Sequence, residues 1–244
     1  MEGRASIYKG RIQLILSNVE LVEEDKINRE DFLPITPKNR EEMFTTIMNI
    51  IEGIKNPYLK QLLNSFFEDS TWVKYFNEAP AAKKNHQAYL GGLLEHTFNM
   101  IALVPSLCAI YPQVDQDLLY TGVILHDIAK IKEYEYEYKI DFTDAGRLLG
   151  HIVMGIQEVD QRITSIEGFP EKLRLKVLHM IASHHGQYEW QSPKRPKFLE
   201  ACLLHHLDLI DTEVFIFNSI SENTQEAWSW SNNLGRYIFK EDND

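Results

Sequence analysis

The sequence predicts a mainly α-helical fold, a helical bundle that follows a short N-terminal β segment. From residue 36 to about residue 222, apolar side chains recur at helical spacing between turn residues. Before that, residues 8–22 alternate, with Ile12, Leu14 and Leu16 on one face, which is the period of a strand. The chain has 244 residues, and 44% of them are hydrophobic, so it can bury a substantial core.

The N-terminal part of the chain is expected to form one or two strands with a turn near Asn18. Residues 23–35 are polar and are expected to be a linker. Thr36 and Pro37 suit the start of a helix, with Thr as the N-cap and Pro at the first helical position. The expected organisation is therefore a β segment with a linker over residues 1–35, a helical domain over residues 36–222 and a tail over residues 223–244.

Within the helical domain, helices are expected near residues 37–54, 57–68, 71–78, 86–111, 115–131, 144–165, 170–184 and 196–221. Pro105 is expected to kink or split the fourth of them. Residues 133–142 alternate with period two, which predicts a small hairpin or extended insert. Tyrosines 134, 136 and 138 fall on one face of it and glutamates 133, 135 and 137 on the other. The tyrosines either pack a surface flap or offer a wall for stacked bases.

The expected helices carry seven side chains that suit metal ions, namely His96, His126, Asp127, His151, His184, His185 and Asp208. Imidazole and carboxylate together suit Mn, Fe, Zn or Ni rather than Mg or Ca alone. Any one of these histidines taken alone is more often structural. The seven together exceed the needs of one ion and suffice for two ions that share a carboxylate, which is an arrangement for phosphoester hydrolysis.

The expected helix ends bring several of these side chains together. His126 and Asp127 lie near the C-terminal end of a helix, where adjacent side chains reach one pocket most easily. His184 and His185 also end a helix, before Gly186, which suits a C-cap.

The motifs resemble the HD-domain metal-dependent phosphohydrolases in their two-metal form, and more narrowly the YhaM family of 3′-to-5′ exoribonucleases. The stretches that carry the resemblance are Lys84–His86, Gly91–His96, Asp117–Lys130, Leu148–Ile152, Ser183–Gly186, Glu189–Lys194 and Leu204–Asp211. Together they cover most of the chain. The two N-terminal strands are similar to the last strands of the OB-fold that precedes the HD domain in this family, although a complete OB-fold needs five strands.

The resemblance implies two divalent transition-metal ions, with manganese expected and Fe, Ni, Zn or Co as alternatives. It places the first ion on His96, His126, Asp127 and Asp208. Asp127 would bridge to the second ion, which His151, His184 and His185 would also hold. Asp127 and Lys130 are the expected catalytic residues, since Lys130 lies one helical turn beyond Asp127. Lys130 would hold a phosphate oxygen; the alternative is a lysine that only complements the helix dipole.

Five side chains are expected to bind substrate: Lys130, His86, Arg147, Trp190 and Lys194. Helix capping is the alternative for His86, and solvated surface is the alternative for the last three. His205 is placed beside Asp208, whereas His179 and His206 are expected to be structural.

Composition limits the setting in which the protein works. No apolar run reaches about 18 residues, and the N-terminus has no apolar signal core, so we expect a cytoplasmic protein without membrane contact. Cys108 and Cys202 are expected to be buried thiols. The net charge of −11 disfavours a grip on many duplex phosphates, but a single strand needs only a small cationic groove.

The predicted function is a two-metal phosphodiesterase, specifically a 3′-to-5′ exoribonuclease that releases 5′-mononucleotides from single-stranded RNA, with single-stranded DNA as a further substrate. A cyclic-dinucleotide phosphodiesterase is an alternative, but its Gly-Tyr-Pro motif is replaced here by the sequence of residues 186–190. A nucleotide phosphohydrolase and a nucleic-acid-binding scaffold with a vestigial site remain further alternatives. The sequence leaves open whether the protein is a homo-oligomer.

Overall fold

The computed structural model describes residues 2–23, 29–84, 86–223 and 227–240, and they are mainly helical, as predicted. The helices are α1 (Arg40–Gly53), α2 (Pro57–Phe67), α3 (Ser70–Glu78), α4 (Gly92–Ile110), α5 (Gln116–Leu125), α6 (Lys130–Glu133), α7 (Asp144–Thr164), α8 (Glu171–Ser183) and α9 (Leu199–Asn223). The strands are β1 (Glu2–Tyr8), β2 (Arg11–Asn18), β3 (Tyr134–Glu135), β4 (Asp141–Phe142), β5 (Trp228–Ser231) and β6 (Arg236–Phe239). Short 3-10 turns lie at Arg29–Asp31 and Tyr188–Trp190.

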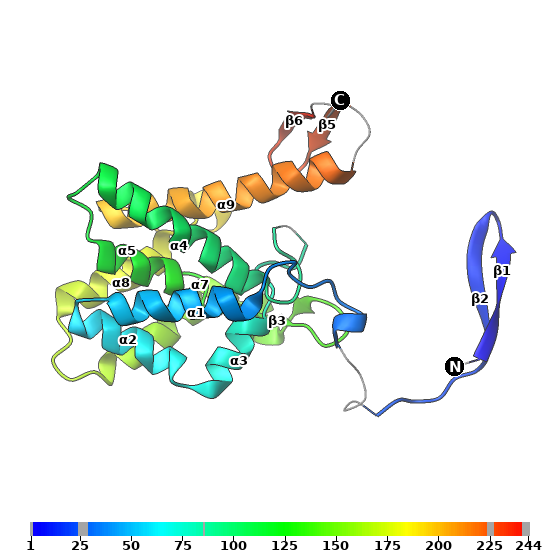
Figure 1. The fold of residues 1–244 in the computed structure, drawn as a ribbon, viewed down its shortest axis with the longest axis horizontal. Coiled ribbons are helices and arrows are strands. Elements are labelled where there is room, and N and C mark those ends of the chain that lie inside the picture. The colour runs from blue at the N-terminus through cyan, green and yellow to red at the C-terminus, as the bar shows by residue number, and fades with distance from the viewer. Residues whose placement is uncertain (1, 24–28, 85, 224–226, 241–244) are drawn as a thin grey trace.

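Helices α4 and α5 form the centre of the bundle (Figure 1). Helix α4 packs against α1, α3, α5 and α9, while α5 packs against α2, α4, α8 and α9. Leu93, Leu94 and Met100 of α4 and Leu118 and Leu119 of α5 are fully buried. By length and composition alone α4 could cross a membrane, and its central place in the bundle accounts for that apolar composition.

The first helix begins later than predicted. Asn39, not Thr36, is its N-cap, because the Asn39 side chain accepts hydrogen bonds from the backbone N–H groups of Glu41 and Glu42. The Thr36 hydroxyl instead donates to the buried carboxylate of Glu95, and the Thr36 N–H bonds the carbonyl of Leu90. The tertiary contact with the start of α4 thus outcompetes a local cap.

Two further helix boundaries were wrong in the prediction. Helix α4 begins at Gly92, after a loop, and not at residue 86, because Gly91 before it has a left-handed backbone with φ of 77°. The helix then continues past Pro105 to Ile110 without a split. The segment predicted as one helix over 115–131 instead ends at Leu125, turns through His126–Ala129 and resumes as the short helix α6.

Helix α7 is interrupted inside its predicted range. Gly150 has φ of 72° and ψ of 159°, which is not helical. A glycine adopts this backbone without the penalty that a Cβ would bring. The break comes directly before His151, so it sets the direction in which that side chain leaves the helix.

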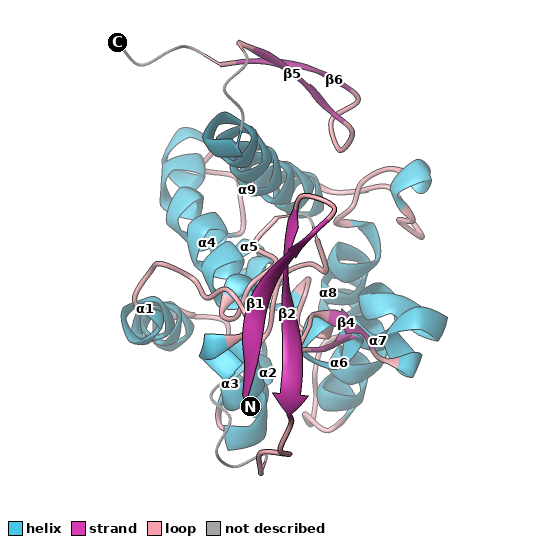
Figure 2. Cartoon of the chain, turned by 90° about the vertical axis from the view of Figure 1, so that its right-hand side faces the viewer, coloured by secondary structure: helices cyan, strands magenta, loops and turns pink. Residues whose placement is uncertain are grey.

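Strands β1 and β2 form an antiparallel hairpin that stands apart from the helical body (Figure 1), and Figure 2 shows the two strands side by side. Its turn is at Lys9 and Gly10, with φ of 50° and 77°, and not near Asn18 as predicted. Positive φ at both central residues is what a tight two-residue hairpin turn requires. Among the described residues these strands pair only with each other, and Ile7, Ile12 and Leu14 are exposed.

Strands β3 and β4 form the small hairpin that the alternating sequence predicts. Tyr134 and Tyr136 are buried in the core, whereas Tyr138 is exposed, so two of the three tyrosines pack the flap instead of forming a stacking wall. Glu133 is also buried, which the alternation did not predict. The expectation of two buried thiols is wrong for Cys202, which is exposed on α9, and Cys108 is half-buried.

The C-terminal segment, expected to be a tail, contains a third antiparallel hairpin formed by β5 and β6. It lies beside the second half of α9 (Figure 1). An ion pair between Arg236 and Glu213 of α9, with 2.9 Å between nitrogen and oxygen, ties the hairpin to that helix. Ser231 and Ile238 are buried.

Candidate metal centre

The structure brings all seven predicted metal ligands to one place in the middle of the bundle. His96 comes from the second turn of α4, and His126 and Asp127 come from the turn after α5. His151 follows the break in α7, the pair His184 and His185 follows α8, and Asp208 lies in α9. Five separate segments therefore contribute, and most of these side chains sit at or near a helix end.

Asp127 lies between two sets of histidines. Its Oδ2 atom is 3.8 Å from His96 Nε2 and 3.3 Å from His126 Nε2. Its Oδ1 atom is 3.4 Å from His151 Nε2 and 3.6 Å from His184 Nε2. One carboxylate oxygen thus faces each set, which is the geometry that a bridging ligand requires.

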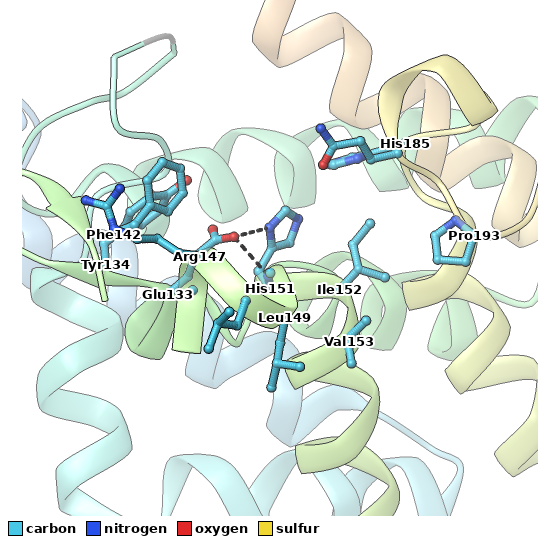
Figure 3. A pocket seen from close by; sticks show the side chains of 14 residues that line it. Glu133, Tyr134, Phe142, Arg147, Leu149, His151, Ile152, Val153, His185 and Pro193 are labelled. Atoms are coloured by element: carbon cyan, nitrogen blue, oxygen red, sulfur yellow. Dashed lines mark hydrogen bonds and ion pairs between the residues drawn. The ribbon is translucent and has the colours of Figure 1, made fainter. Parts of the chain in front are cut away.

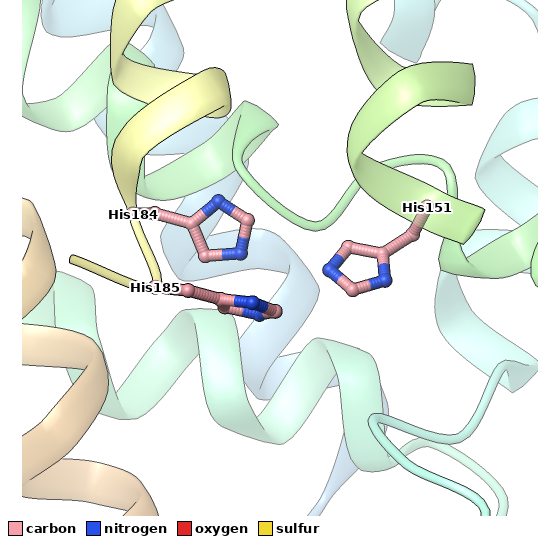
Figure 4. Close-up of side chains that lie close together, drawn as sticks. All are labelled: His151, His184 and His185. Carbon is pink, nitrogen blue, oxygen red and sulfur yellow. The ribbon is translucent and has the colours of Figure 1, made fainter. Parts of the chain in front are cut away.

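The ligand atoms on the two sides of Asp127 form compact groups. His96, His126 and Asp208 form the inner group, and His151, His184 and His185 form the outer group, and within each group the ligand atoms lie within 4.8 Å of one another. The three rings of the outer group face a common space (Figure 4). Each group could therefore hold one cation.

In the inner group, Nδ1 of each histidine already has a hydrogen-bond partner. His126 Nδ1 donates to the carbonyl of Val123 at 2.9 Å. His96 Nδ1 lies 2.7 Å from Asp211 Oδ2, and Gln87 and Asn99 donate to the same carboxylate at 2.7 Å each. A fixed Nδ1 turns the Nε2 lone pair toward the centre, which is how metal-binding histidines are oriented.

The outer group is oriented in the same way by different acceptors. His184 Nδ1 donates to the carbonyl of Ile181 and His185 Nδ1 to the carbonyl of Trp190, both at 2.8 Å. His151 Nδ1 lies 3.0 Å from Glu133 Oε1, which also accepts from the His151 backbone N–H (Figure 3). In all five histidines, the group bonded to Nδ1 therefore orients the ring so that Nε2 lies on the opposite side, toward the centre.

The lack of hydrogen-bond partners for several buried atoms at the centre bears on whether a cation fits there. Asp127 Oδ1, His151 Nε2 and His184 Nε2 are buried, and no described residue gives them a hydrogen bond. Buried polar atoms without a partner are costly in a folded protein. A divalent cation coordinated by these atoms would satisfy them, so the outer group and Asp127 Oδ1 fit a metal ion.

The pKa shifts of the histidines differ between the inner and the outer group. Burial alone would lower the pKa of His96, but hydrogen bonds to Asp208 and Asp211 and their charges outweigh burial and raise it to about 10. Burial and the neighbouring histidines lower the pKa of His184 and of His185. Burial would raise the pKa of Asp127, but the charges of Lys130 and His126 hold it well below its usual range. The centre therefore keeps the Asp127 carboxylate ionised and the imidazoles of His184 and His185 neutral.

Two cavities open at the metal centre and share His185. The larger, of about 620 Å³, lies along the start of α7 beside Glu133, Phe142 and His151 (Figure 3). The smaller, of about 390 Å³, lies between α9 and the C-terminal hairpin and is lined by Lys130, Asp208 and Leu234 among others. A chain-like substrate could therefore approach or leave the centre on two sides.

Three of the predicted substrate-binding residues line the smaller cavity. Lys130 is buried, and its Nζ lies 2.6 Å from Asp127 Oδ2. Trp190 is half-exposed. Both ring nitrogens of His86 are buried and lack a hydrogen-bond partner among the described residues. Burial and the charges of Lys130 and His96 lower the pKa of His86 to about 3, so its ring is neutral.

The other two predicted substrate residues lie farther from the ligands. Arg147 is on the rim of the larger cavity and pairs with Asp141, with 2.8 Å between nitrogen and oxygen. Lys194 is exposed and lines neither cavity; its charge acts on His179 instead. His179 accepts a hydrogen bond from the backbone N–H of Lys197.

His205 positions the turn that carries the outer group. Its Nδ1 donates to the carbonyl of His184 at 2.8 Å. Gly186, with φ of 74°, lies so close that a Cβ there would come within 2.3 Å of the His205 ring. Only glycine therefore fits between this ring and the turn.

Sequence reasoning missed four side chains that orient the ligands: Glu133, Asp211, Gln87 and Asn99. Asp211 had a visible signal, since it lies three residues after Asp208 on the same face of a helix. The period-two pattern placed Glu133 on a solvent face, although it lies at the end of α6 and not within a strand. Nothing in the local sequence of Gln87 or Asn99 indicates that either reaches Asp211 in α9.

Comparison with known proteins supports the geometry. The profile of the HD domain matches residues 93–213. The 3′-5′ exoribonuclease YhaM of Bacillus subtilis (strain 168) is 36% identical over 219 residues, which are 89% of this chain and 69% of that protein. The chain belongs to the YhaM family. The Bacillus pumilus member is 35% identical over the same length, and the Oceanobacillus iheyensis member is 35% identical over 227 residues, 91% of this chain and 70% of that protein.

Membership of the YhaM family and the HD domain make this chain a metal-dependent hydrolase and confirm the family resemblance seen in the sequence. The seven ligand-type residues lie between His96 and Asp208, inside the matched HD segment. No solved structure matches the chain significantly.

Proposed function

We propose that the protein is a two-metal phosphodiesterase that removes 5′-mononucleotides from the 3′ end of single-stranded RNA. The observation that carries the proposal is the position of Asp127, whose two carboxylate oxygens face different histidine groups. The relatives that bear the name 3′-5′ exoribonuclease supply the substrate class and the direction of attack.

The inner group and Asp127 would hold one ion, and the outer group and Asp127 the other. When bound, such a pair supplies an activated water near neutral pH and neutralises phosphate oxygens. Manganese is the ion we expect, because mixed imidazole and carboxylate sets suit it. The protein holds these ligands in place before substrate arrives, since every Nδ1 atom is already fixed by a hydrogen bond.

Lys130 is the side chain best placed to contact the reacting phosphate. Its ammonium group holds Asp127 at 2.6 Å and lines the smaller cavity. An ammonium has three N–H donors, so it can keep Asp127 oriented and also donate to a phosphate oxygen. We assign both roles to Lys130.

His86 and Trp190 would bind the terminal nucleotide in the smaller cavity. Because the His86 ring is neutral and its nitrogens lack partners, it can donate one hydrogen bond and accept another, as a ribose hydroxyl or a base edge requires. The half-exposed Trp190 ring offers a face for a base. The Trp190 carbonyl also fixes His185, so this one residue links base binding to the outer group.

Arg147 would contact a phosphate at the rim of the larger cavity. Its guanidinium shares Asp141 with Lys83 and Lys139, so three cations surround one carboxylate there. Lys194 lies outside both cavities. It would contact only a phosphate farther along the RNA strand.

The decisive experiment offers single-stranded RNA labelled at its 5′ end to the purified protein with added Mn²⁺. The expected result is a ladder that shortens gradually from the 3′ end, with 5′-mononucleotides as products and slower action on duplex RNA. Single-stranded DNA and cyclic dinucleotides run in parallel. Cleavage of cyclic dinucleotides alone, or products that end in a 3′-phosphate, would overturn the proposal.

A further inference from the structure

The C-terminal hairpin carries four aromatic side chains on one exposed face. Trp228 pairs across the strands with Phe239, and Trp230 pairs with Tyr237. The ring centroids are 5.0 Å apart in the first pair and 5.1 Å apart in the second. All four side chains are more than half exposed, at 57%, 53%, 53% and 64% for Trp228, Phe239, Trp230 and Tyr237.

This exposure follows from the alternation of the strands. Side chains at every second position of a strand share a face, and on the opposite face Ser231 and Ile238 are buried. The hairpin thus buries its small and aliphatic residues and leaves its large rings in solvent. Tryptophan and tyrosine left exposed together in this way form a binding surface more often than scattered apolar residues do.

The turn of the same hairpin lines the catalytic cavity. Asn233, Leu234 and Arg236 share the smaller cavity with Lys130 and Asp208. Trp230 and Tyr237 are the pair nearer this turn, and Trp228 and Phe239 are the pair farther from it. The strands that carry the aromatic face therefore start at the cavity, although the four rings themselves do not line it.

The charged side chain of the hairpin that contacts α9 lies away from its aromatic face. Arg236 alternates with Tyr237 along the strand, so it is on the face opposite the rings, where it pairs with Glu213 of α9. Residues 227–240 contain no aspartate or glutamate, so no carboxylate among them would repel an anionic strand. Residues two apart on a strand are roughly 7 Å apart, so the two rings on each strand offer separate faces to separate bases.

We propose that the aromatic face of the C-terminal hairpin, made of Trp228, Trp230, Tyr237 and Phe239, stacks bases of a single-stranded nucleic acid whose 3′ end occupies the smaller cavity. This inference rests on the proposed function, which supplies the strand and its direction. Stacking on aromatic rings tolerates any base, so the hairpin would lengthen the substrate contact without adding sequence preference. Duplexes would be excluded, because their bases are already stacked and paired.

The test measures binding of a hydrolysis-resistant, phosphorothioate-linked single strand of about 12 nucleotides to the Mn²⁺-loaded protein. The double variant Trp228→Ala/Trp230→Ala should raise the Kd between about 5-fold and 150-fold, as expected from the loss of one to a few stacked bases. An abasic strand with the same backbone should bind the variant and the unaltered protein alike. Hydrolysis of a trinucleotide, whose bases would occupy the cavity and not the aromatic face, should keep its kcat/KM.

Two control variants make the result specific. Trp228→Phe/Trp230→Phe keeps aromatic faces and should keep most of the affinity. Tyr111→Ala removes an exposed ring at the far end of α4 and should change nothing. Circular dichroism of each variant checks that the helical body is intact.

The inference is overturned if the alanine variant binds the long strand as the unaltered protein does. It is also overturned if the abasic strand loses affinity to the same extent, or if the phenylalanine variant behaves like the alanine variant. A protein that binds the strand through the hairpin but cleaves no RNA would refute the proposed function and leave this inference standing. Normal cleavage of RNA with no effect of the hairpin variants would support the proposed function and refute this inference.

Discussion

The inner and outer groups share Asp127 and use the same imidazole nitrogens, but their surroundings differ. His96 of the inner group is fully buried, and Asp211, Gln87 and Asn99 form a network behind it. The outer group lies against the larger cavity, and His151 keeps 13% of its side chain exposed. The Nδ1 atoms of the outer histidines are held by two backbone carbonyls and by the single carboxylate of Glu133.

The comparison shows how one fold can give two similar ligand sets different tasks. Asp208 and Asp211 make the inner group rich in negative charge, and they raise the pKa of His96 to about 10. The outer histidines 184 and 185 have lowered pKa values and are ready as neutral ligands. We expect the inner group to hold its cation firmly and the outer group to exchange ligands with water and substrate.

The largest expected effect comes from removing the ligand that the two groups share. In the proposed two-metal arrangement, Asp127→Ala would leave two cations without a bridging charge, so hydrolysis of single-stranded RNA should fall by several orders of magnitude. The helical fold should persist, because the core around the site is apolar. Steady-state kinetics with Mn²⁺ and metal analysis measure the loss, and the exposed Asp31→Ala is the matched control. Near-normal turnover by Asp127→Ala would refute the shared-ligand arrangement.

The second prediction sets one histidine of each group against the other. His96→Ala removes the protonated imidazole that pairs with the carboxylates of Asp208 and Asp211 and leaves Asp211 only the neutral donors Gln87 and Asn99. Removing one partner of such a largely buried pair should lower the free energy of unfolding by about 3–5 kcal/mol. His185→Ala loses one hydrogen bond to a carbonyl, which should cost about 1 kcal/mol. Urea unfolding of the metal-free variants measures both. Equal losses would show that the two groups are equally built into the core.

A smaller effect is expected from the carboxylates behind the ligands. Asp211→Asn should weaken the inner ion and Glu133→Gln the outer ion, each by about 10- to 100-fold, because such partners orient a ligand histidine and raise its basicity. Titration of each variant with Mn²⁺, followed by metal analysis, shows which ion is lost. If Glu133→Gln weakened the ion that Asp211→Asn weakens, the two groups would not be separate sites.

The smallest expected effect is a difference of one in the number of protons that the two groups release when they bind an ion. At neutral pH His96 in the metal-free protein is protonated, since its pKa of about 10 lies above the pH. A cation at His96 Nε2 must displace that proton, so the affinity of the inner group should rise with pH up to that value. Ion binding by His184 and His185 should release no proton, because their pKa values are lowered. Calorimetric titration in buffers of different ionisation enthalpy counts the protons, and equal release at both steps would contradict the distinction.

Much of the fold followed from local patterns in the sequence. Apolar periodicity predicted the order of the main helices and the small hairpin at residues 133–142, because burying one face of each element demands that periodicity. Boundaries failed where a distant group outcompeted the local one. Thr36 bonds Glu95 instead of capping α1, and Gly150 breaks α7 just before His151. The C-terminal hairpin was missed although residues 228–231 alternate aromatic and serine side chains with the period of a strand, because each strand is only four residues long.

The candidate site, like the fold, was partly predictable from the sequence. The sequence by itself indicated the ligand-type side chains, since seven histidines and aspartates in or beside the helices are chemically suited to a metal pair. Only the tertiary structure decided which oxygen of Asp127 faces which histidines, and which groups fix each Nδ1 atom. Those partners come from segments far apart in the chain, such as Gln87 of a loop and Asp211 of α9. Spacing along a sequence carries ligand chemistry, but contacts between distant segments arise only when the bundle packs.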